Sequence, residues 1–213
     1  MPNIENLLDD VAETLNDPKT KHMEQWFSSI DLKYAYSQLR LHPDTMKHCN
    51  FNMVGGSATG TYIFKTGFYG LTDMPAEFQK AIDCTLTGLK NIFCFLDDIL
   101  KASRGTKEEH LKLVEACLTK LENENLAISL RKCKIAVQNI EWLGYQIDGD
   151  GVIPLVSKIE SVKAIERPTT HAKLRSFMGA VHHLTKHIEN LAAICAPFRD
   201  ILKKENKYVW TQA

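Results

Sequence analysis

Two adjacent acids inside an apolar stretch constrain this chain more than any other feature. Segment 91–102 reads NIFCFLDDILKA, with apolar residues on both sides of Asp97 and Asp98. This pattern predicts a tight β-hairpin with the two acids at its tip. Burying unpaired carboxylates is costly unless cations or hydrogen-bond donors compensate for them. We therefore expect positive charge beside the tip, unless the acids are simply exposed turn formers.

A third acid, Asp31, follows the apolar strand pattern of residues 26–30. It would lie beside the hairpin if both segments belong to one sheet. Three oxygen-donor side chains that converge at strand ends are typical of a Mg²⁺ site. In a two-metal site, one ion activates an attacking hydroxyl and the other stabilises the leaving oxygens. From spacing alone, an exposed turn carrying acids is an equally good interpretation.

Composition narrows the class of protein. The 213 residues are 44% hydrophobic and 24% charged, which is typical of a globular chain with one large domain or two small ones. Lys plus Arg and Asp plus Glu both number 26, so phosphate contacts would have to come from local basic patches. Six cysteines without paired spacing or a secretory leader favour reduced thiols in an intracellular protein, in the cytoplasm and/or nucleus. No apolar run approaches the roughly 18 residues of a membrane helix, so we expect no membrane partner.

The first half of the chain alternates between helical and extended patterns. Apolar spacing predicts a helix over residues 4–15, and then a strand and a turn around Asp31. Two extended runs between 51 and 64 flank the sequence GGSATG and predict a hairpin. Pro75 is suited to the first turn of a helix that Gly88 ends.

Further along, Thr106 and Glu109 form a capping box. It predicts a long helix whose buried stripe would be Leu111, Val114, Leu118 and Leu121. Extended runs are predicted over 127–130, 134–137 and 142–147, followed by a turn over 148–151.

The pattern changes near residues 152–154, after which only helices are predicted. Ser157 with Glu160 reads as a second capping box, and Thr170 as the cap of a further helix. We therefore predict an α+β domain over residues 1–151 and a small helical domain over 152–213.

Five motifs occur in a fixed order. Between residues 27 and 39 the chain reads FSSIDLKYAYSQL, at 68–79 it reads FYGLTDMPAEFQ, and at 95–98 FLDD. It continues with WLGY at 142–145 and with LRSFMG at 174–179, in a region that extends to Trp210. In text, order and spacing, the chain resembles the reverse transcriptases of Gypsy/Ty3-type LTR retrotransposons, over the palm and thumb region of a Pol polyprotein.

This resemblance implies a right-hand polymerase, with a palm made of an antiparallel sheet and packed helices, followed by a small helical thumb. The implied activity is that of an RNA-directed DNA polymerase, a nucleotidyltransferase that extends a primer 3′-hydroxyl with dNTPs on an RNA or DNA template. Asp31, Asp97 and Asp98 would be the catalytic carboxylates. Together with the backbone carbonyl of Leu32, they would hold two Mg²⁺ ions, for which Mn²⁺ is a possible substitute.

The resemblance also assigns a nucleotide pocket. Tyr36 would lie under the incoming sugar and reject a 2′-hydroxyl, which is the chief local difference between RNA and DNA precursors. Tyr69, Gly70 and Pro75 would line the same pocket, although the family often has Phe at the position of Tyr69. From the residues alone, Tyr36 reads as a core aromatic, and Gly70 and Pro75 as an ordinary turn before a helix.

Contacts to primer and template are implied for two segments. Trp142, Leu143, Gly144 and Tyr145 resemble the primer-grip hairpin. Lys173 and Arg175 belong to a basic helical face, for which a solvated surface is an equally good interpretation; its other members are Lys158, Lys163, Lys186 and His187. The spacing of His182, His183, His187 and Cys195 matches no closed zinc site.

The fingers of such a polymerase are largely missing from this chain, and no ribonuclease H domain follows it. We expect a longer polyprotein to supply both. The alternative function is a catalytically inactive retroelement remnant, or a nucleic-acid- or protein-binding module that retains the palm fold.

Overall fold

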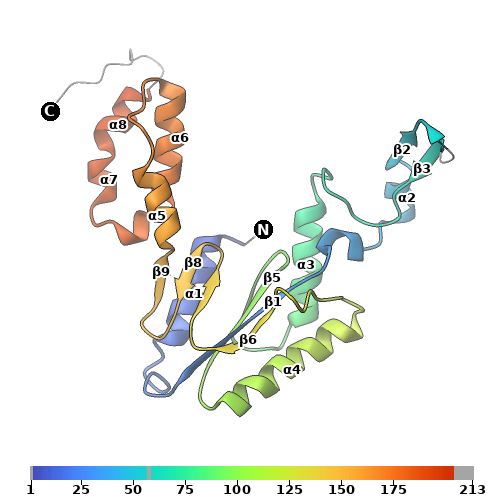
Figure 1. Cartoon of the computed structure of the whole chain (residues 1–213), viewed down its shortest axis with the longest axis horizontal. Coiled ribbons are helices and arrows are strands. Elements are labelled where there is room, and N and C mark those ends of the chain that lie inside the picture. The colour runs from blue at the N-terminus through green and yellow to red at the C-terminus, as the bar shows by residue number, and fades with distance from the viewer. Residues whose placement is uncertain (1, 57–58, 204–213) are drawn as a thin grey trace. The chain divides into compact units, whose positions relative to one another are not determined.

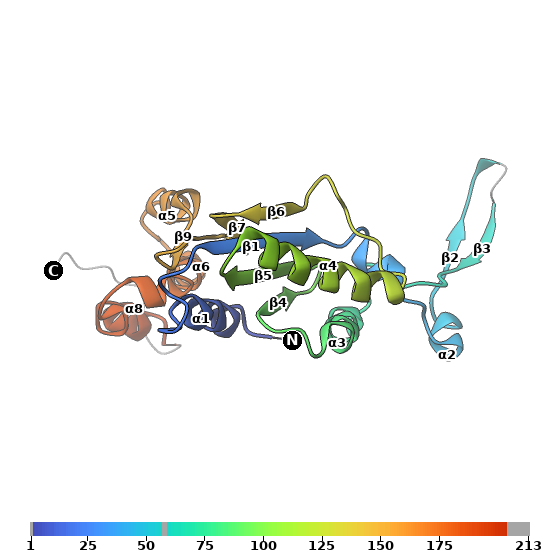
Figure 2. The same cartoon turned by 90° about the horizontal axis from the view of Figure 1, so that it is seen from below.

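The computed structural model describes residues 2–56 and 59–203. The chain divides into two compact units, one comprising Met1–Leu143 with Ile147–Val152 and the other Gly144–Gln146 with Ile153–Ala213. The predicted loop residues 57–58 and Trp210 lie outside the described residues. Figures 1 and 2 show the elements in two views.

The first unit mixes helices and strands, as predicted from the sequence, and it also contains the short helix α2, which was not predicted. Its elements are α1 (Ile4–Leu15), β1 (Gln25–Asp31), η1 (Ala35–Gln38), α2 (Pro43–Met46), β2 (Asn50–Met53), β3 (Gly60–Ile63), α3 (Met74–Leu86), β4 (Ile92–Phe95), β5 (Asp98–Arg104), α4 (Lys107–Asn123), β6 (Lys134–Val137) and β7 (Ile140–Trp142). The boundary between the units passes through β8 (Tyr145–Ile147) and β9 (Val152–Pro154).

Helices make up most of the described part of the second unit. They are α5 (Val156–Lys163), α6 (His171–His182), the short 3-10 helix η3 (Thr185–His187), α7 (Leu191–Ile194) and α8 (Ala196–Ile201). Val181, Leu191 and Cys195 form its small buried cluster. As predicted, Thr170 caps α6, because its side chain accepts a hydrogen bond from the Lys173 N–H.

A four-stranded sheet organises the first unit, in the order β4-β5-β1-β6. Every neighbouring pair of strands is antiparallel. The register places Asp98 opposite both Asp31 of β1 and Phe95 of β4, so the ends of three strands meet there. Figure 2 shows β4, β5, β1 and β6 in this order. Two smaller sheets pair β2 with β3 and join β7, β8 and β9.

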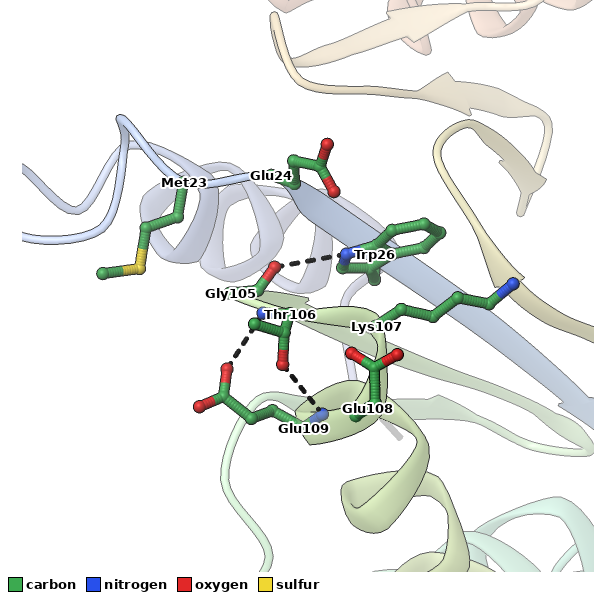
Figure 3. A pocket seen from close by; sticks show the side chains of 8 residues that line it. All are labelled: Met23, Glu24, Trp26, Gly105, Thr106, Lys107, Glu108 and Glu109. Atoms are coloured by element: carbon green, nitrogen blue, oxygen red, sulfur yellow. Dashed lines mark hydrogen bonds between the residues drawn. The ribbon is translucent and has the colours of Figure 1, made fainter.

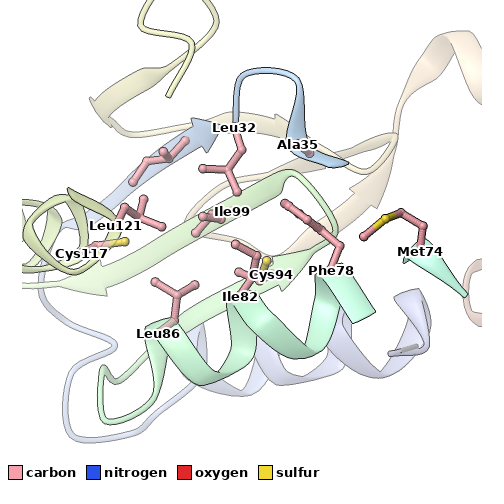
Figure 4. Packing of buried hydrophobic residues seen from close by; sticks show 11 residues of the cluster. Leu32, Ala35, Met74, Phe78, Ile82, Leu86, Cys94, Ile99, Cys117 and Leu121 are labelled. Carbon is pink, nitrogen blue, oxygen red and sulfur yellow. The ribbon is translucent and has the colours of Figure 1, made fainter. Parts of the chain in front are cut away.

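The main core fills the space between this sheet and two helices. Successive side chains of a strand point to opposite faces, so Ile30, Ile99 and Cys94, which are cross-strand neighbours, share one face. They belong to the same buried cluster as Phe78 and Ile82 of α3. Cys117 and Leu121 of α4 complete this side of the core, as Figure 4 shows.

Several predicted elements are confirmed. Helix α1 occupies the predicted range and begins at Asn3, whose side chain caps it. The hairpins β2–β3 and β4–β5 are present, and Pro75 lies in the first turn of α3. The capping box of α4 is formed by Thr106 and Glu109.

The predicted buried stripe of α4 is confirmed at Val114 and Leu121, but it is wrong at Leu111 and Leu118, where the preceding residues His110 and Cys117 are buried instead. His110, Val114, Cys117 and Leu121 are buried, whereas Leu111 is 40% exposed. Sequence reasoning favours Leu over His at a buried position, but hydroxyl groups of the sheet supply partners for the imidazole. His110 Nε2 lies 2.7 Å from Ser28 Oγ and its Nδ1 lies 2.6 Å from Ser103 Oγ.

Three further local predictions are wrong. Residues 127–130 form no strand, and only Ile128 makes an isolated bridge, to Leu32. The run 142–147 is broken at Leu143 and Gly144, whose positive φ angles of 49° and 80° turn the chain between β7 and β8. Ser157 does not cap α5, because the N-cap residue is Leu155 and it makes no side-chain cap.

The described residues contain no helix that is long and apolar enough to cross a membrane. All six cysteines are free thiols, and Cys49, Cys94, Cys117 and Cys195 are buried.

Candidate active site

The sheet brings the three predicted carboxylates together. Asp31 ends β1, and Asp98, directly opposite, begins β5. Asp97 lies in the turn between β4 and β5, and its carbonyl oxygen accepts the Leu32 N–H at 3.0 Å. Two strand ends and one turn therefore converge, with the backbone of Leu32 bound to the same turn.

Gln79 of α3 fixes the turn that carries Asp97. Its side chain is buried and accepts the Leu96 N–H at 2.8 Å. Its amide nitrogen donates to the Cys94 carbonyl at 3.1 Å and to Asp83 at 2.9 Å. Leu96 has φ 55°, a left-handed conformation that a non-glycine residue adopts only at a cost. One helix side chain thus stabilises a strained turn that carries Asp97 and leads into Asp98.

Negative charge accumulates at this end of the sheet. The pKa of Asp98 is raised above its ordinary value, first by burial of its carboxyl group and then by the nearby charges of Asp97 and Asp31. Lys132 opposes this effect. Its Nζ lies 3.1 Å from Asp31 Oδ2, and the ion pair raises the pKa of Lys132.

The chemistry of these donors suits a hard divalent cation. All are carboxylate or carbonyl oxygens, the ligands that Mg²⁺ prefers. The mutual repulsion that raises the pKa of Asp98 is what a bound cation would relieve. Within residues 2–56 and 59–203, however, no three His, Cys, Asp or Glu side chains are already arranged to hold a metal. Binding by all three acids therefore requires their side chains to turn toward a common point.

Tyr36 lies beside the carboxylates, in the short helix η1. Its ring makes edge contacts with Tyr69, at a centroid distance of 5.2 Å, and with Phe78, at 5.6 Å. Burial, followed by the charges of Asp97 and Tyr69, raises the pKa of its phenol. Packing on Phe78 fits the core-aromatic interpretation, while the contact with the 82% exposed Tyr69 leaves one side of Tyr36 toward the surface. The two interpretations are compatible.

Gly70 and Pro75 lie on either side of the loop that enters α3. Gly70 has φ 108°, a conformation open to glycine but strained for other residues. A hollow of about 780 Å³ lies beside this loop, and its lining includes Arg40, Asp73 and Glu77. Of the predicted nucleotide-binding residues, Tyr36 and Tyr69 are in contact, whereas none of the four lines this hollow.

The predicted primer-contact segment lies in the small sheet. Trp142 is buried, and its indole Nε1 has no hydrogen-bond partner among the described residues. Tyr145 is also buried, and its hydroxyl donates to the His183 carbonyl at 3.1 Å. Lys158 Nζ lies 4.1 Å from the centre of the Tyr145 ring, a cation–π contact.

Lys173 and Arg175 are exposed in the first turns of α6. They belong to the second unit, whereas the three carboxylates belong to the first. Neither the fold nor the local contacts assign them a partner.

Sequence reasoning missed Gln79 and Lys132 as residues of this site. Gln79 was read only as part of a motif, although a glutamine on the apolar face of a helix is a signal of buried hydrogen bonding. Lys132 gave no local signal, because it is 101 residues from Asp31. Gln38 was missed for the same reason. Its side chain makes two hydrogen bonds with Ala127 and so ties the segment after α4 to η1.

A second hollow lies at the other end of β1 and β5, where Met23, Glu24 and Trp26 meet the start of α4 (Figure 3). The Trp26 indole donates to the Gly105 carbonyl at 3.2 Å, and the capping box of Thr106 and Glu109 forms part of the wall. None of the predicted site residues lies here.

An antiparallel sheet with Asp31, Asp97 and Asp98 at one end is the arrangement expected for the class of nucleic-acid polymerases with a palm domain. Within that class, residues 1–147 match the family model described as "Reverse transcriptase (RNA-dependent DNA polymerase)". The chain belongs to the reverse transcriptase family.

Two relatives from Schizosaccharomyces pombe are transposon polyproteins. The Transposon Tf2-3 polyprotein is 32% identical over 187 residues, and the Transposon Tf2-7 polyprotein is 31% identical over the same length. Each match covers 87% of this chain but only 14% of the relative. The chain thus corresponds to a small part of these polyproteins, and the predicted resemblance to retrotransposon reverse transcriptases is confirmed.

The fold is similar to that of foamy viral protease-reverse transcriptase in complex with double-stranded DNA. The TM-score is 0.80 at 21% identity, over 95% of this chain and 35% of the viral chain. A second structure of that viral protein, with an RNA/DNA hybrid, gives a TM-score of 0.75 at 20% identity, over 95% of this chain and 26% of the other. At this identity the similarity establishes the fold, and the predicted fold class, a polymerase palm with a helical thumb, is confirmed.

Proposed function

We propose that this chain is the palm and thumb part of an RNA-directed DNA polymerase, which adds dNTPs to a primer 3′-hydroxyl. The observation that carries the proposal is the convergence of Asp31, Asp97 and Asp98 at one end of the sheet. Membership of the reverse transcriptase family supports it. In this proposal residues 1–151 form the palm and residues 152–213 the thumb.

The family generally uses divalent metal ions, and we propose two Mg²⁺ ions here, with Mn²⁺ as a substitute. Asp31 and Asp97 would bind both ions, the Leu32 carbonyl would add a backbone ligand, and Asp98 would complete the charge cluster. When bound, the metals supply activation of the primer hydroxyl and stabilisation of the pyrophosphate oxygens. Gln79 and the Leu32 N–H keep the backbone of the turn that carries Asp97 in place, so that only the Asp97 side chain has to reorient to bind a metal.

Substrate contacts are assigned to the surrounding residues. Tyr36 would lie under the sugar of the incoming nucleotide, with Tyr69, Gly70 and Pro75 along the same pocket. Trp142, Leu143, Gly144 and Tyr145 would contact the primer, while Lys173 and Arg175 would contact phosphates of the primer and template. An intracellular location and a longer polyprotein that supplies fingers and ribonuclease H remain predictions.

Primer extension on an RNA template with dNTPs and Mg²⁺ tests the proposal. The Asp97→Asn variant should lose about 100-fold or more of the activity, because it removes a charged metal ligand and keeps the shape of the side chain. Asp10→Asn, which removes an exposed acid of α1, is the matched control and should retain full activity. A folded chain that extends no primer, with or without Asp97, would instead favour the inactive remnant or binding module.

A further inference from the structure

Lys132 is attached to the candidate active site by its backbone as well as by its side chain. The Ser129 N–H donates to the Asp31 carbonyl at 2.8 Å, and Ile128 bridges to Leu32. The Lys132 N–H in turn donates to the Ser129 carbonyl at 2.9 Å. The segment that carries Lys132 is therefore fixed to the same residue whose carboxylate its ammonium group contacts.

The ion pair is unequal in exposure. The Asp31 side chain is 16% exposed, whereas that of Lys132 is 67% exposed. Among ion pairs of the described residues, this is the one that includes any of the three site acids, so Lys132 supplies the direct cationic contact at the cluster. A lysine reaches Asp31 as a point charge on a flexible four-carbon stem, so its head can move while the backbone stays in place.

We propose that Lys132 is a stand-in cation that holds Asp31 while no metal is bound, and that it must release Asp31 Oδ2 before a divalent ion can use that oxygen. This inference rests on the proposed metal site. An ion pair with one exposed partner contributes little to stability, so a doubly charged ion can displace it. Release of Lys132 and metal loading are then linked, and Asp31 does not stand unpaired beside two other acids in the metal-free state.

The exchange predicts effects of opposite sign when the charge of Lys132 is removed. In Lys132→Met the metal-free chain loses a favourable contact, so its melting temperature should fall by about 1–3 °C. Its affinity for a divalent ion should rise by about threefold to tenfold, because both a competitor for Asp31 and a repelling charge are gone. If Lys132 merely supported the local fold, its removal would lower both the melting temperature and the affinity for a divalent ion.

Direct Mn²⁺ binding to the whole chain tests this without nucleotide or turnover. Free Mn²⁺ is measured by electron paramagnetic resonance for the wild type, Lys132→Met, Arg131→Met and Asp31→Asn. Arg131 is the matched control, since it is the exposed neighbour with the same charge. Its variant should change the affinity by less than about twofold at moderate salt, where charges without direct contact are screened.

The outcomes separate this inference from the proposed function. Tighter binding in Lys132→Met alone, with weaker binding in Asp31→Asn, supports the exchange. Unchanged or weaker binding in Lys132→Met overturns the exchange, while weaker binding in Asp31→Asn would still uphold the metal site. If Mn²⁺ does not bind, or if it binds equally well to Asp31→Asn, both the exchange and the metal site are overturned.

Discussion

Strands β1 and β5 carry two sets of polar groups whose surroundings differ. The interior network, which consists of Ser28, Lys101, Ser103 and His110, is buried, and each member has a hydrogen-bond partner. The carboxylate end, which consists of Asp31, Asp97 and Asp98, gathers like charges with Lys132 as the contacting cation. The same pair of strands thus satisfies its polar groups where they support the fold and leaves negative charge only partly compensated at the proposed site.

The interior network explains why polar side chains are tolerated there. Ser28 Oγ accepts the Ala136 N–H at 2.9 Å, which leaves its own hydrogen available for His110 Nε2. His110 Nδ1 lies 2.6 Å from Ser103 Oγ, and a neutral imidazole donates at one ring nitrogen and accepts at the other. Lys101 donates to the Lys90 carbonyl at 2.7 Å, and burial lowers its pKa to about 8. The network therefore joins β1, β5, β6 and α4 at the centre of the first unit.

The largest effect is expected from breaking the interior network. His110→Leu removes two buried hydrogen bonds and leaves the hydroxyls of Ser28 and Ser103 without that partner. It should lower the free energy of unfolding by about 2–4 kcal/mol. Urea denaturation at pH 7 measures this, with His22→Leu at an exposed position as the control. A loss no larger than that of the control would show that the network does not stabilise the fold.

A loss of stability that also originates in His110 is expected when the pH is lowered. Burial, followed by the charge of Lys101, lowers the pKa of His110 to about 4, whereas an unfolded histidine titrates near 6.5. As the pH falls from about 6.5 to 4, the unfolded chain binds a proton that the folded chain does not, so stability decreases, by at most about 3 kcal/mol. Unfolding free energies measured across this range should show a shallower slope in His110→Leu. Identical slopes would contradict the assignment.

The smallest effect, with the opposite sign, is expected at the carboxylate end. Because the folded state raises the pKa of Asp98, the ionised carboxylate is destabilising above that pKa, and this destabilisation disappears as the pH falls through it. Asp98→Asn should therefore stabilise the metal-free chain at pH 7, by a few tenths to about 1 kcal/mol after allowance for solvent screening. Thermal unfolding in the presence of EDTA measures this, with Asp10→Asn as the control. A destabilised Asp98→Asn would mean that the acids are not in repulsion.

The hairpin 91–102 and the helix after Thr106 were predictable because their signals are local. Turn-forming acids between apolar runs and a capping box act within a few residues. Which residues of α4 are buried was not predictable to within one position along the helix, because burial of His110 depends on hydroxyl groups from two strands. The turn at Leu143 and Gly144 was not predicted, because the neighbouring apolar residues suggest one continuous strand. The turn depends on positive φ angles at these two residues.

The sequence by itself determined most of the main elements, the fold class and the family, and it singled out the three acids as candidates, because motif text and periodicity are properties of neighbouring residues. The tertiary structure alone decided which distant groups meet those acids. Strand pairing places Asp31 opposite Asp98, Gln79 reaches the turn from a helix, and Lys132 arrives from a segment 101 residues from Asp31. Contacts of this kind follow from strand register and from the packing of helices on the sheet, which no local pattern encodes.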